Sequence, residues 1–423
     1  MALPAVLPVG VPAALPISPQ RLDASVQEFG RVGALPGGGV ARLALTDADR
    51  AGRDLLVARM RTLGLTVSVD AIGNIFGTRA GDGSTQGTVM VGSHIDTVST
   101  GGLYDGTFGV LAGLEVVATL NDMGARTRHP ITIAAFTNEE GARFQPDMLG
   151  SLVFAGGLAL DEALALRDAD GAVLGDELRR IGYAGQDRGP ADMTAYFELH
   201  IEQGPVLERE GVQIGVVSGV QGISWHEITV RGRSAHAGTT PMAMRHDAGH
   251  AAARIVCGAH DMARTLGPDQ LVATGYTRLT PNLVNVIAQE AVFTVDLRNP
   301  DNAALQQADA ALLGIAQDVA TQTGTDVTCR TLARFDPVAF DPACVDAVEH
   351  TARALGYSTR RLHSGAGHDA QMIARIAPAA MIFVPSVGGI SHNVREFTAL
   401  DDLVRGTAVL ARLVADHAGA TPA

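Results

Sequence analysis

The sequence predicts an α/β protein in which a doubly wound mixed sheet carries a smaller inserted αβ domain. Apolar, strand-like runs recur along the first 200 residues with helical patterns between them, which is typical of a doubly wound sheet. The chain has 423 residues, which is longer than a domain built on a single hydrophobic core usually is, so two domains are expected. The pattern changes near residue 223, where an alternating strand and alanine-rich helical segments follow.

Composition narrows the class of protein and its partners. With 46% hydrophobic and 18% charged residues, the chain has ample material for a folded core. A net charge of -13 argues against nucleic acid or an anionic membrane as partner, because both favour clustered basic residues. The three cysteines are widely spaced, and no run of about 20 apolar residues predicts a membrane span. We therefore expect a cytoplasmic protein.

The first expected domain covers residues 17–222 and 337–423, preceded by a flexible tail at 1–16 that has a proline at every fourth position. Apolar stripes at helical spacing predict helices, and continuous apolar runs predict buried strands. Helical patterns begin near Arg21 and include 55–63 and 107–123, and the strands are expected at 89–92, 131–136, 195–197 and 380–384.

The inserted domain is expected at residues 223–336. It opens with an alternating strand at 225–232 and closes before the strand at 380–384 resumes the earlier pattern, which indicates an insertion into the first domain. Between these limits we expect helices at 247–264 and 303–323, and a pair of strands joined by a turn at 285–288 and 291–298.

Imidazoles and carboxylates gather directly after the predicted strands of the first domain. Ligands in open α/β sheets lie beyond the carboxyl ends of strands, so one sheet edge could collect these side chains. Such a set suits a borderline divalent cation, and a shared carboxylate can bridge two ions. Zinc fits the ligand types best, although manganese, cobalt or nickel would accept them. The residues are His94, Asp105, Glu139, Glu140, His200 and His392.

The side chains of the adjacent Glu139 and Glu140 cannot point the same way, so we expect them to have different roles. One would bind metal while the other takes a proton from water. The alternative is a solvated loop, which is common for isolated glutamates. Taken alone, residues 92–106 are equally compatible with a metal site and with an ordinary polar loop. The downstream residues decide between these two interpretations.

Eight ordered motifs together resemble the M20 metallopeptidase family, in its amidase, hydantoinase and carbamoylase branch. The resemblance runs from about residue 17 to the C-terminus, and the motifs are GSHIDTV, GGLYDGTFGV, TNEEGARF, ELHIEQGP, RGRSAHAGTTPM, DLRNP, SGAGHDA and GGISHN. It implies a hydrolase of non-peptide amide bonds that converts N-carbamoyl-L-amino acids to amino acid, carbon dioxide and ammonia. Allantoate amidohydrolase and β-ureidopropionase are the alternatives. An aminoacylase or peptidase of the family is disfavoured, since those relatives generally carry a carboxylate where this chain has His200.

The resemblance also implies a binuclear centre of two divalent ions per subunit. One ion would be held by His94, Asp105 and His200, and the other by Asp105, Glu140 and His392. Glu139 would be the general base. Asp96 would orient His94 without touching metal, as buried imidazole ligands generally require. His368 is not counted among the ligands.

The remaining implied residues bind the substrate. Gln203 would contact the ureido group, His236 would stabilise the oxyanion, and Asn285 and Arg298 would bind the substrate carboxylate, a group that guanidinium matches bidentately. Each of the last three could instead be an ordinary surface or turn residue. The backbone at Gly365 and Gly367 would line the pocket. The inserted domain would close over the metals as a lid and pair two subunits in a homodimer.

Overall fold

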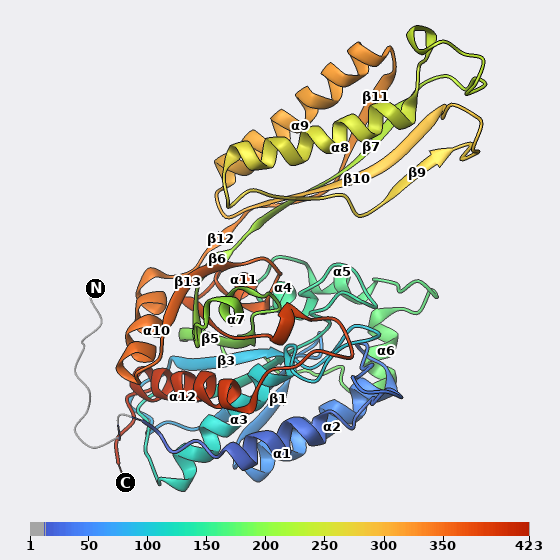
Figure 1. The fold of residues 1–423 in the computed structure, drawn as a ribbon. Coiled ribbons are helices and arrows are strands. Elements are labelled where there is room, and N and C mark those ends of the chain that lie inside the picture. Colours follow the sequence, from blue (N-terminus) through green and yellow to red (C-terminus); the bar gives the residue numbers. More distant parts are fainter. Residues whose placement is uncertain (1–11, 13, 423) are drawn as a thin grey trace. The chain divides into compact units, whose positions relative to one another are not determined.

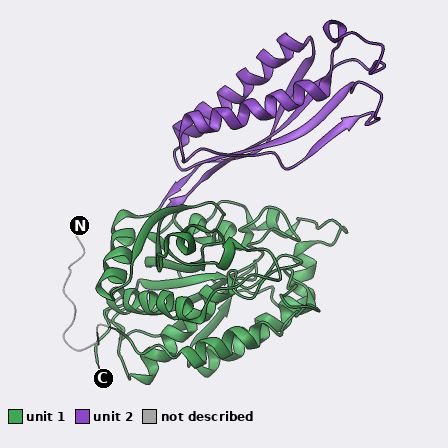
Figure 2. Cartoon of the chain, in the orientation of Figure 1, with its two compact units in different colours: residues 1–218, 340–423 green, residues 219–339 purple. Residues whose placement is uncertain are grey.

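In the computed structural model, which describes residue 12 and residues 14–422, the chain divides into two compact units (Figure 1). Unit 1 comprises residues 1–218 and 340–423, and unit 2 comprises residues 219–339 (Figure 2). The segment 223–336, expected as an insertion, lies within unit 2. Most of the expected tail at 1–16 lies outside the described residues, but Leu15 near its end is buried.

Unit 1 is built on a mixed sheet with the strand order β1-β2-β4-β3-β5-β14-β6-β12, and β13 pairs with β6; β12 and the last two residues of β6 fall within the bounds of unit 2. The central strands β4, β3, β5 and β14 run parallel, whereas β2 and β6 join them antiparallel. The predicted mixed α/β sheet is therefore confirmed. The strands are Thr66–Val69 (β1), Ile75–Arg79 (β2), Thr88–His94 (β3), Ile131–Phe136 (β4), Met193–Ile201 (β5), Ile214–Val220 (β6), Val338–Ala339 (β12), Thr359–Ser364 (β13) and Ala379–Val384 (β14).

Helices cover both faces of this sheet. The group α1, α3, α10 and α12 packs on one face, and α4 with α11 packs on the other (Figure 1). The helices are Pro19–Phe29 (α1), Asp47–Thr62 (α2), Thr107–Asp122 (α3), Leu149–Phe154 (α4), Leu160–Leu164 (α5), Leu174–Ile181 (α6), Val206–Glu210 (α7), Pro342–Ala354 (α10), Asp369–Ile373 (α11) and Leu400–His417 (α12), with a short 3-10 turn at Val387–Gly389 (η2).

The core of unit 1 lies between the central strands and α3. Strands β3, β4 and β14 are buried at every position, as expected for parallel strands covered on both faces. Helix α3 is buried from Thr107 to Leu120 and contacts β3 and β5. Because α3 begins two residues after Asp105, this packing holds the loop between β3 and α3 against the ends of the central strands.

Unit 2 is an antiparallel sheet with two helices on one face (Figure 1). The strand order is β11-β7-β10-β8, and β9 pairs with β10. Its core is formed by the inward residues of β7 and β10 and by the facing sides of α8 and α9. The elements are Gly222–Arg231 (β7), Met242–Met244 (η1), Ala248–Leu266 (α8), Leu271–Ala273 (β8), Thr277–Thr280 (β9), Glu290–Asn299 (β10), Asn302–Thr323 (α9) and Asp326–Phe335 (β11).

The strand expected at 285–288 is wrong. Strand β10 pairs with β9 instead, and residues 285–288 form only an isolated bridge between Val286 and His236. Pro281, which has no N–H to donate, directly follows β9, and the chain leaves the ladder there. Ile287 and Ala288 are nevertheless buried, so their apolar character reflects packing of a loop against the core of unit 2.

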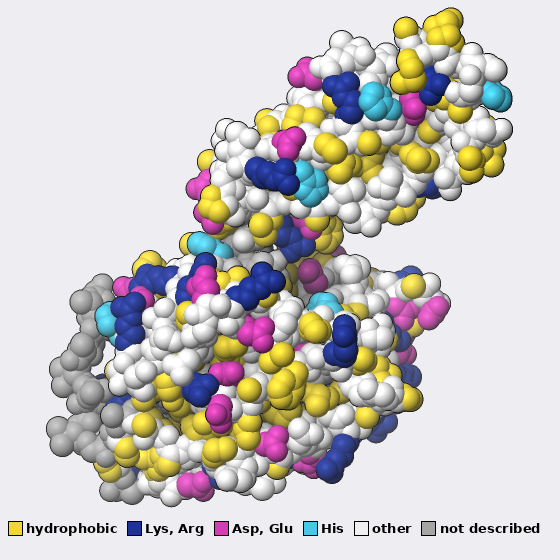
Figure 3. All heavy atoms as spheres, viewed as in Figure 1, with side chains coloured by type: hydrophobic (Ala, Val, Ile, Leu, Met, Phe, Trp, Pro, Cys, Tyr) yellow, Lys and Arg dark blue, Asp and Glu magenta, His cyan; other side chains and the backbone are white. Residues whose placement is uncertain are grey.

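None of the described helices has both the length and the apolar character needed to cross a bilayer. On the face drawn in Figure 3, arginine side chains are dispersed among acidic ones instead of gathering in one patch.

Candidate metal centre

The loop between β3 and α3 brings two predicted ligands back toward each other. His94 is the last residue of β3, and Asp105 precedes the helix by two residues. Between Asp105 and the helix, Gly106 adopts a φ of 59°, and a Cβ there would lie 2.2 Å from His94 Nε2. Only glycine therefore leaves room for the imidazole at this turn.

The first donor cluster contains His94, Asp105 and His200, all of which are buried. His200 lies near the end of β5, next to β3 in the sheet, and its Nε2 is 3.1 Å from Asp105 Oδ1. The Nε2 atom of His94 is 3.7 Å from the same oxygen. Both Nδ1 atoms contact backbone carbonyls, so each ring presents Nε2 to the centre.

The second donor cluster contains Asp105, Glu140 and His392. His392 Nε2 lies 3.3 Å from Asp105 Oδ2 and 3.2 Å from Glu140 Oε2. The two oxygens of Asp105 thus face different clusters. In each cluster the donor atoms lie within 4.8 Å of one another. Imidazole nitrogen and carboxylate oxygen are the ligands of borderline divalent cations, so both clusters fit such ions.

Glu139 and Glu140 follow β4 and face different partners. Glu139 Oε2 lies 3.3 Å from His94 Nε2, on the side of the first cluster, whereas Glu140 joins the second cluster. Asp96 accepts hydrogen bonds from the backbone N–H groups of both glutamates. Its carboxylate is 4.0 Å from His94 Nδ1, whereas its backbone oxygen contacts Nδ1 at 2.9 Å. Asp96 therefore holds the backbone of Glu139 and Glu140 in place, in addition to lying near His94, its expected partner.

A small pocket opens onto these residues and includes Gln203 and Gly367. Gln203 donates through Nε2 to Asp105 Oδ2 at 2.9 Å, while its buried Oε1 has no hydrogen-bond partner among the described residues. Gly367 lines the pocket beside Ala366, and Gly365 lies two residues earlier in the chain. Unsatisfied buried oxygens are uncommon, so Gln203 Oε1 is available to a ligand donor.

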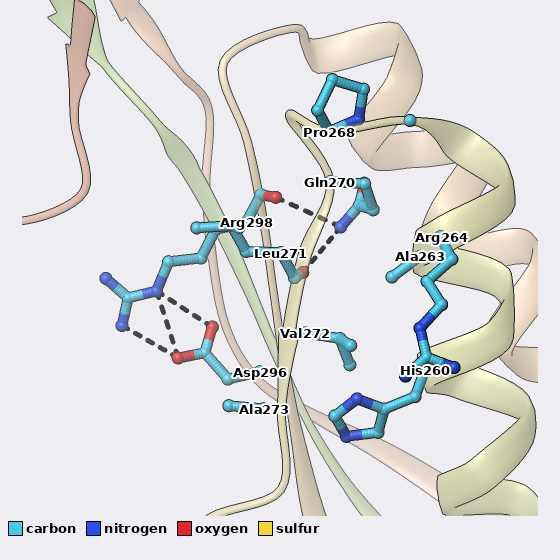
Figure 4. Close-up of a pocket in the computed structure, with 11 residues that line it drawn as sticks. His260, Ala263, Arg264, Pro268, Gln270, Leu271, Val272, Ala273, Asp296 and Arg298 are labelled. Atoms are coloured by element: carbon cyan, nitrogen blue, oxygen red, sulfur yellow. Dashed lines mark hydrogen bonds and ion pairs between the residues drawn. The ribbon is translucent and has the colours of Figure 1, made fainter. Parts of the chain in front are cut away.

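The other predicted substrate-binding residues lie in unit 2. The backbone of Ala237 donates to Asn285, and His236 bridges to Val286, so His236 and Asn285 come together. Both side chains are exposed. Arg298 lies apart from them on β10, where its guanidinium makes a bidentate ion pair with Asp296 beside a surface pocket (Figure 4). Unit 1 alone therefore brings together the predicted metal ligands, but His236, Asn285 and Arg298 belong to unit 2.

Two supporting residues escaped the sequence analysis. Glu396 accepts hydrogen bonds from the backbone N–H groups of Tyr104 and Asp105 and from the hydroxyl of Ser391. Ser391 Oγ also lies 2.9 Å from Asp105 Oδ2, so its single hydroxyl proton is shared between the two carboxylates. The sequence feature that could have identified Ser391 and Glu396 is their position close to His392 in the same loop. A third donor group, Glu198, His200 and His368, shares His200, but its Glu198 already accepts bonds from Ser93, Tyr196 and Ala370.

Without metal, most pKa values around the clusters are raised, whereas that of Asp105, despite burial, is held well below its usual range by hydrogen bonds from His200 and His392. Burial raises the pKa of Asp96 to about 7 and that of Glu396 to about 7. Burial, together with the charges of neighbouring carboxylates, raises the pKa of Glu139 well above its usual range. Burial opposes charge on His200, but Asp105 outweighs it and raises the pKa to about 9. Hydrogen bonds to Asp105 and Glu140 raise the pKa of His392 to about 11.

We therefore expect the metal-free protein to lose stability as the pH rises from about 5 to about 8. The carboxyls release their protons above about 4 when unfolded but near 7 when folded, and the imidazoles release theirs above about 6.5 when unfolded but later when folded. In this window the folded chain binds more protons, so deprotonation favours unfolding. Burial lowers the pKa of His368 and His417, which act oppositely but are outnumbered.

The measurement is the thermal unfolding midpoint of chelator-treated protein across that range. A midpoint that rises toward about pH 8 would contradict the expectation. Added zinc should raise the midpoint most at the alkaline end, because the ligands must lose their protons to bind a cation.

Comparison with known proteins places this geometry in a family. The model of peptidase family M20/M25/M40 matches residues 90–416. An N-carbamoyl-L-amino-acid amidohydrolase from Rhizobium meliloti is 45% identical over 95% of this chain and 97% of its own. An allantoate amidohydrolase from Bacillus subtilis is 34% identical over 92% and 95%. The crystal structure of an amidase of the hydantoinase/carbamoylase family from Burkholderia multivorans superposes with a TM-score of 0.94, at 46% identity, over 97% of this chain and 100% of that chain.

Proposed function

Because this chain belongs to peptidase family M20/M25/M40, we propose that it is a binuclear metal-dependent amidohydrolase of N-carbamoyl-L-amino acids. Water would cleave the ureido C–N bond and release the amino acid and carbamate, which decomposes to carbon dioxide and ammonia. The observation that carries this proposal is the pair of donor clusters sharing Asp105, in a chain 45% identical to such an amidohydrolase.

The five ligands would hold two divalent cations, with zinc the best fit and manganese, cobalt or nickel acceptable. When bound, the cations supply positive charge that polarises the ureido carbonyl and lowers the pKa of water. His94 and His200 would serve one ion, Glu140 and His392 the other, and Asp105 both.

Glu139 acts as the general base. It lies beside the first cluster without belonging to either one, so its carboxylate can accept the proton of the attacking water and pass it to the leaving nitrogen. The hydrogen bonds from the Glu139 and Glu140 N–H groups to Asp96 hold the two glutamates in their separate positions. This division of labour requires both side chains, one as base and one as ligand.

Substrate recognition is shared between the two units. In unit 1, Gln203 Oε1, which has no hydrogen-bond partner among the described residues, accepts a ureido N–H, and the backbone near Gly365 and Gly367 lines the pocket. From unit 2, His236 would stabilise the oxyanion and Asn285 and Arg298 would bind the substrate carboxylate; because Arg298 lies apart from Asn285 within one chain, the two would come from different subunits of the homodimer. We assign to unit 2 the roles of lid and of the surface that pairs subunits in a homodimer.

The test is ammonia release from a panel of ureido acids by metal-free protein reconstituted with zinc, manganese, cobalt or nickel. N-carbamoyl-L-methionine is expected to have a kcat/KM at least about tenfold above that of its D enantiomer, N-carbamoyl-β-alanine and allantoate. Chelated protein without added metal is the control and should release no ammonia. Fastest turnover of allantoate or of N-carbamoyl-β-alanine would replace the proposed substrate, and no turnover of any compound would overturn the function.

A further inference from the structure

Two buried arginines donate hydrogen bonds to the loops that carry the predicted metal ligands. They belong to a part of the chain that precedes the region matched by the family model. Arg42 is 2% exposed and Arg53, in α2, is 1% exposed. A buried guanidinium is costly unless its N–H groups are bonded, so the partners of these side chains show what they hold together.

Arg42 spans the two ends of the loop that joins His94 to Asp105. Its Nε donates to the carbonyl of Ile95 at 2.6 Å, directly after His94. Its Nη2 donates to Thr107 Oγ1 at 3.0 Å, two residues after Asp105. The remaining Nη1 donates to two carbonyls at the end of α1 and just beyond it. One side chain thus ties both ligand-bearing ends of the loop to the N-terminal helix.

The backbone around Arg42 holds the middle of the same loop. Arg42 N–H donates to Thr97 Oγ1 at 2.8 Å, and Thr97 N–H donates back to the carbonyl of Arg42 at 3.0 Å. Two residues earlier, Val40 and Gly101 exchange a pair of backbone hydrogen bonds at 2.9 Å. The segment 40–42 therefore lies alongside the loop between β3 and α3 and fixes its path through these hydrogen bonds.

Arg53 holds the second ligand loop in a similar way. Its Nη2 donates to Thr137 Oγ1 at 3.2 Å, two residues before Glu139. Its Nη1 donates to the carbonyl of Gly73 at 2.6 Å, and its Nε pairs with Asp49 at 2.8 Å. Asp49, one turn earlier in α2, also accepts the N–H of Leu45. The start of the glutamate loop is thus attached to α2.

The charge of these side chains also suits the site. Burial lowers the pKa of Arg42 to about 10, against the raising effect of Asp49 and Asp96, so it stays cationic at neutral pH. Burial raises the pKa of Asp96, and the positive charge of Arg53 partly offsets this effect. Two fixed cations therefore lie near carboxylates that would otherwise repel one another before metal binds.

We propose that Arg42 and Arg53 are positioning residues of the metal centre: Arg42 sets the separation of His94 and Asp105, and Arg53 sets the position of the Glu139–Glu140 loop. Neither side chain donates a hydrogen bond to a donor atom of the two clusters. This inference rests on the metal centre of the proposed function but not on its substrate. It predicts that loss of either contact weakens metal binding before it unfolds the chain.

The sharpest variants are Thr107→Val and Thr137→Val, which remove the hydroxyl acceptors of Arg42 and Arg53 with little change of volume. The matched control is Thr407→Val in α12, also fully buried, whose hydroxyl donates only to the carbonyl of Leu403. We expect each of the first two to weaken zinc binding about tenfold in a chelator competition, and the control to change it less than about twofold. Thermal midpoints of the metal-free variants are measured alongside.

Arg42→Met and Arg42→Lys extend the test, with Arg412→Met as the control for removal of a buried arginine. We expect Arg42→Met to weaken zinc binding more than Thr107→Val does. Arg42→Lys keeps the charge, so its zinc affinity should lie between that of Arg42→Met and that of wild type. The inference is overturned if both threonine variants keep wild-type zinc affinity, or if the control loses as much. Wild-type protein that binds two zinc ions but hydrolyses no ureido acid would refute the proposed function and leave this inference standing.

Discussion

Glu139→Gln is expected to bind two metal ions with nearly wild-type affinity and to lose about a thousandfold in kcat, within the range that a general base contributes. Glutamine keeps the shape of the side chain but cannot accept the proton of the attacking water. Glu139 is 7% exposed and belongs to neither donor cluster, so its loss leaves every ligand in place. The measurements are metal content per chain and kcat for ammonia release.

Two matched glutamate variants separate the base from its surroundings. Glu140→Gln changes the adjacent residue in the same way, but it removes an oxygen of the second cluster, so metal content should fall together with activity. Glu162→Gln in α5 alters an exposed glutamate and should change neither quantity. If Glu139→Gln retained more than about a tenth of wild-type kcat, the assignment of the base would fail.

The clustering of the predicted metal ligands could be inferred from the sequence because a simple rule relates strand order to position in space. Parallel strands that neighbour one another place the residues after their carboxyl ends at one edge of the sheet. His94 ends β3, Glu139 follows β4 and His200 lies near the end of β5, and these three strands are neighbours in the observed order. Each apolar run was continuous and fully buried, so the strands themselves were recognisable.

The supporting contacts could not be predicted, because they join residues far apart in sequence through groups that leave no pattern. Arg42 bonds to backbone carbonyls and to a threonine 65 residues away, and any sequence offers such acceptors. The carboxylate of Asp96 was expected to orient His94, and its further hydrogen bonds from backbone N–H groups 43 and 44 residues later left no sequence pattern. The misassigned strand at 285–288 shows the same limit, since apolar residues in a packed loop look like a strand.

Asp105→Asn is expected to abolish binding of both metal ions, because Asp105 is the one side chain that belongs to both donor clusters in the described part of the chain. Its Oδ1 faces His200 Nε2, and its Oδ2 faces His392 Nε2 while accepting from Gln203 and Ser391. An asparagine must put its NH₂ group at one of these two positions. At Oδ1 it would point donors at the first ion. At Oδ2 it would oppose the donors of Gln203 and Ser391 as well as the second ion.

The loss should exceed that of any variant confined to one cluster. Removal of outer-shell partners typically weakens metal binding by about 10-fold to 100-fold, so a change in a shared ligand should exceed 100-fold and reduce kcat/KM to the level of chelated protein. Metal content is predicted to fall from two ions per chain to none in Asp105→Asn but only to one in Glu140→Gln. Asp122→Asn, at the exposed end of α3, is the control. Two ions retained by Asp105→Asn would mean that the clusters do not share this carboxylate, and the binuclear arrangement would have to be abandoned.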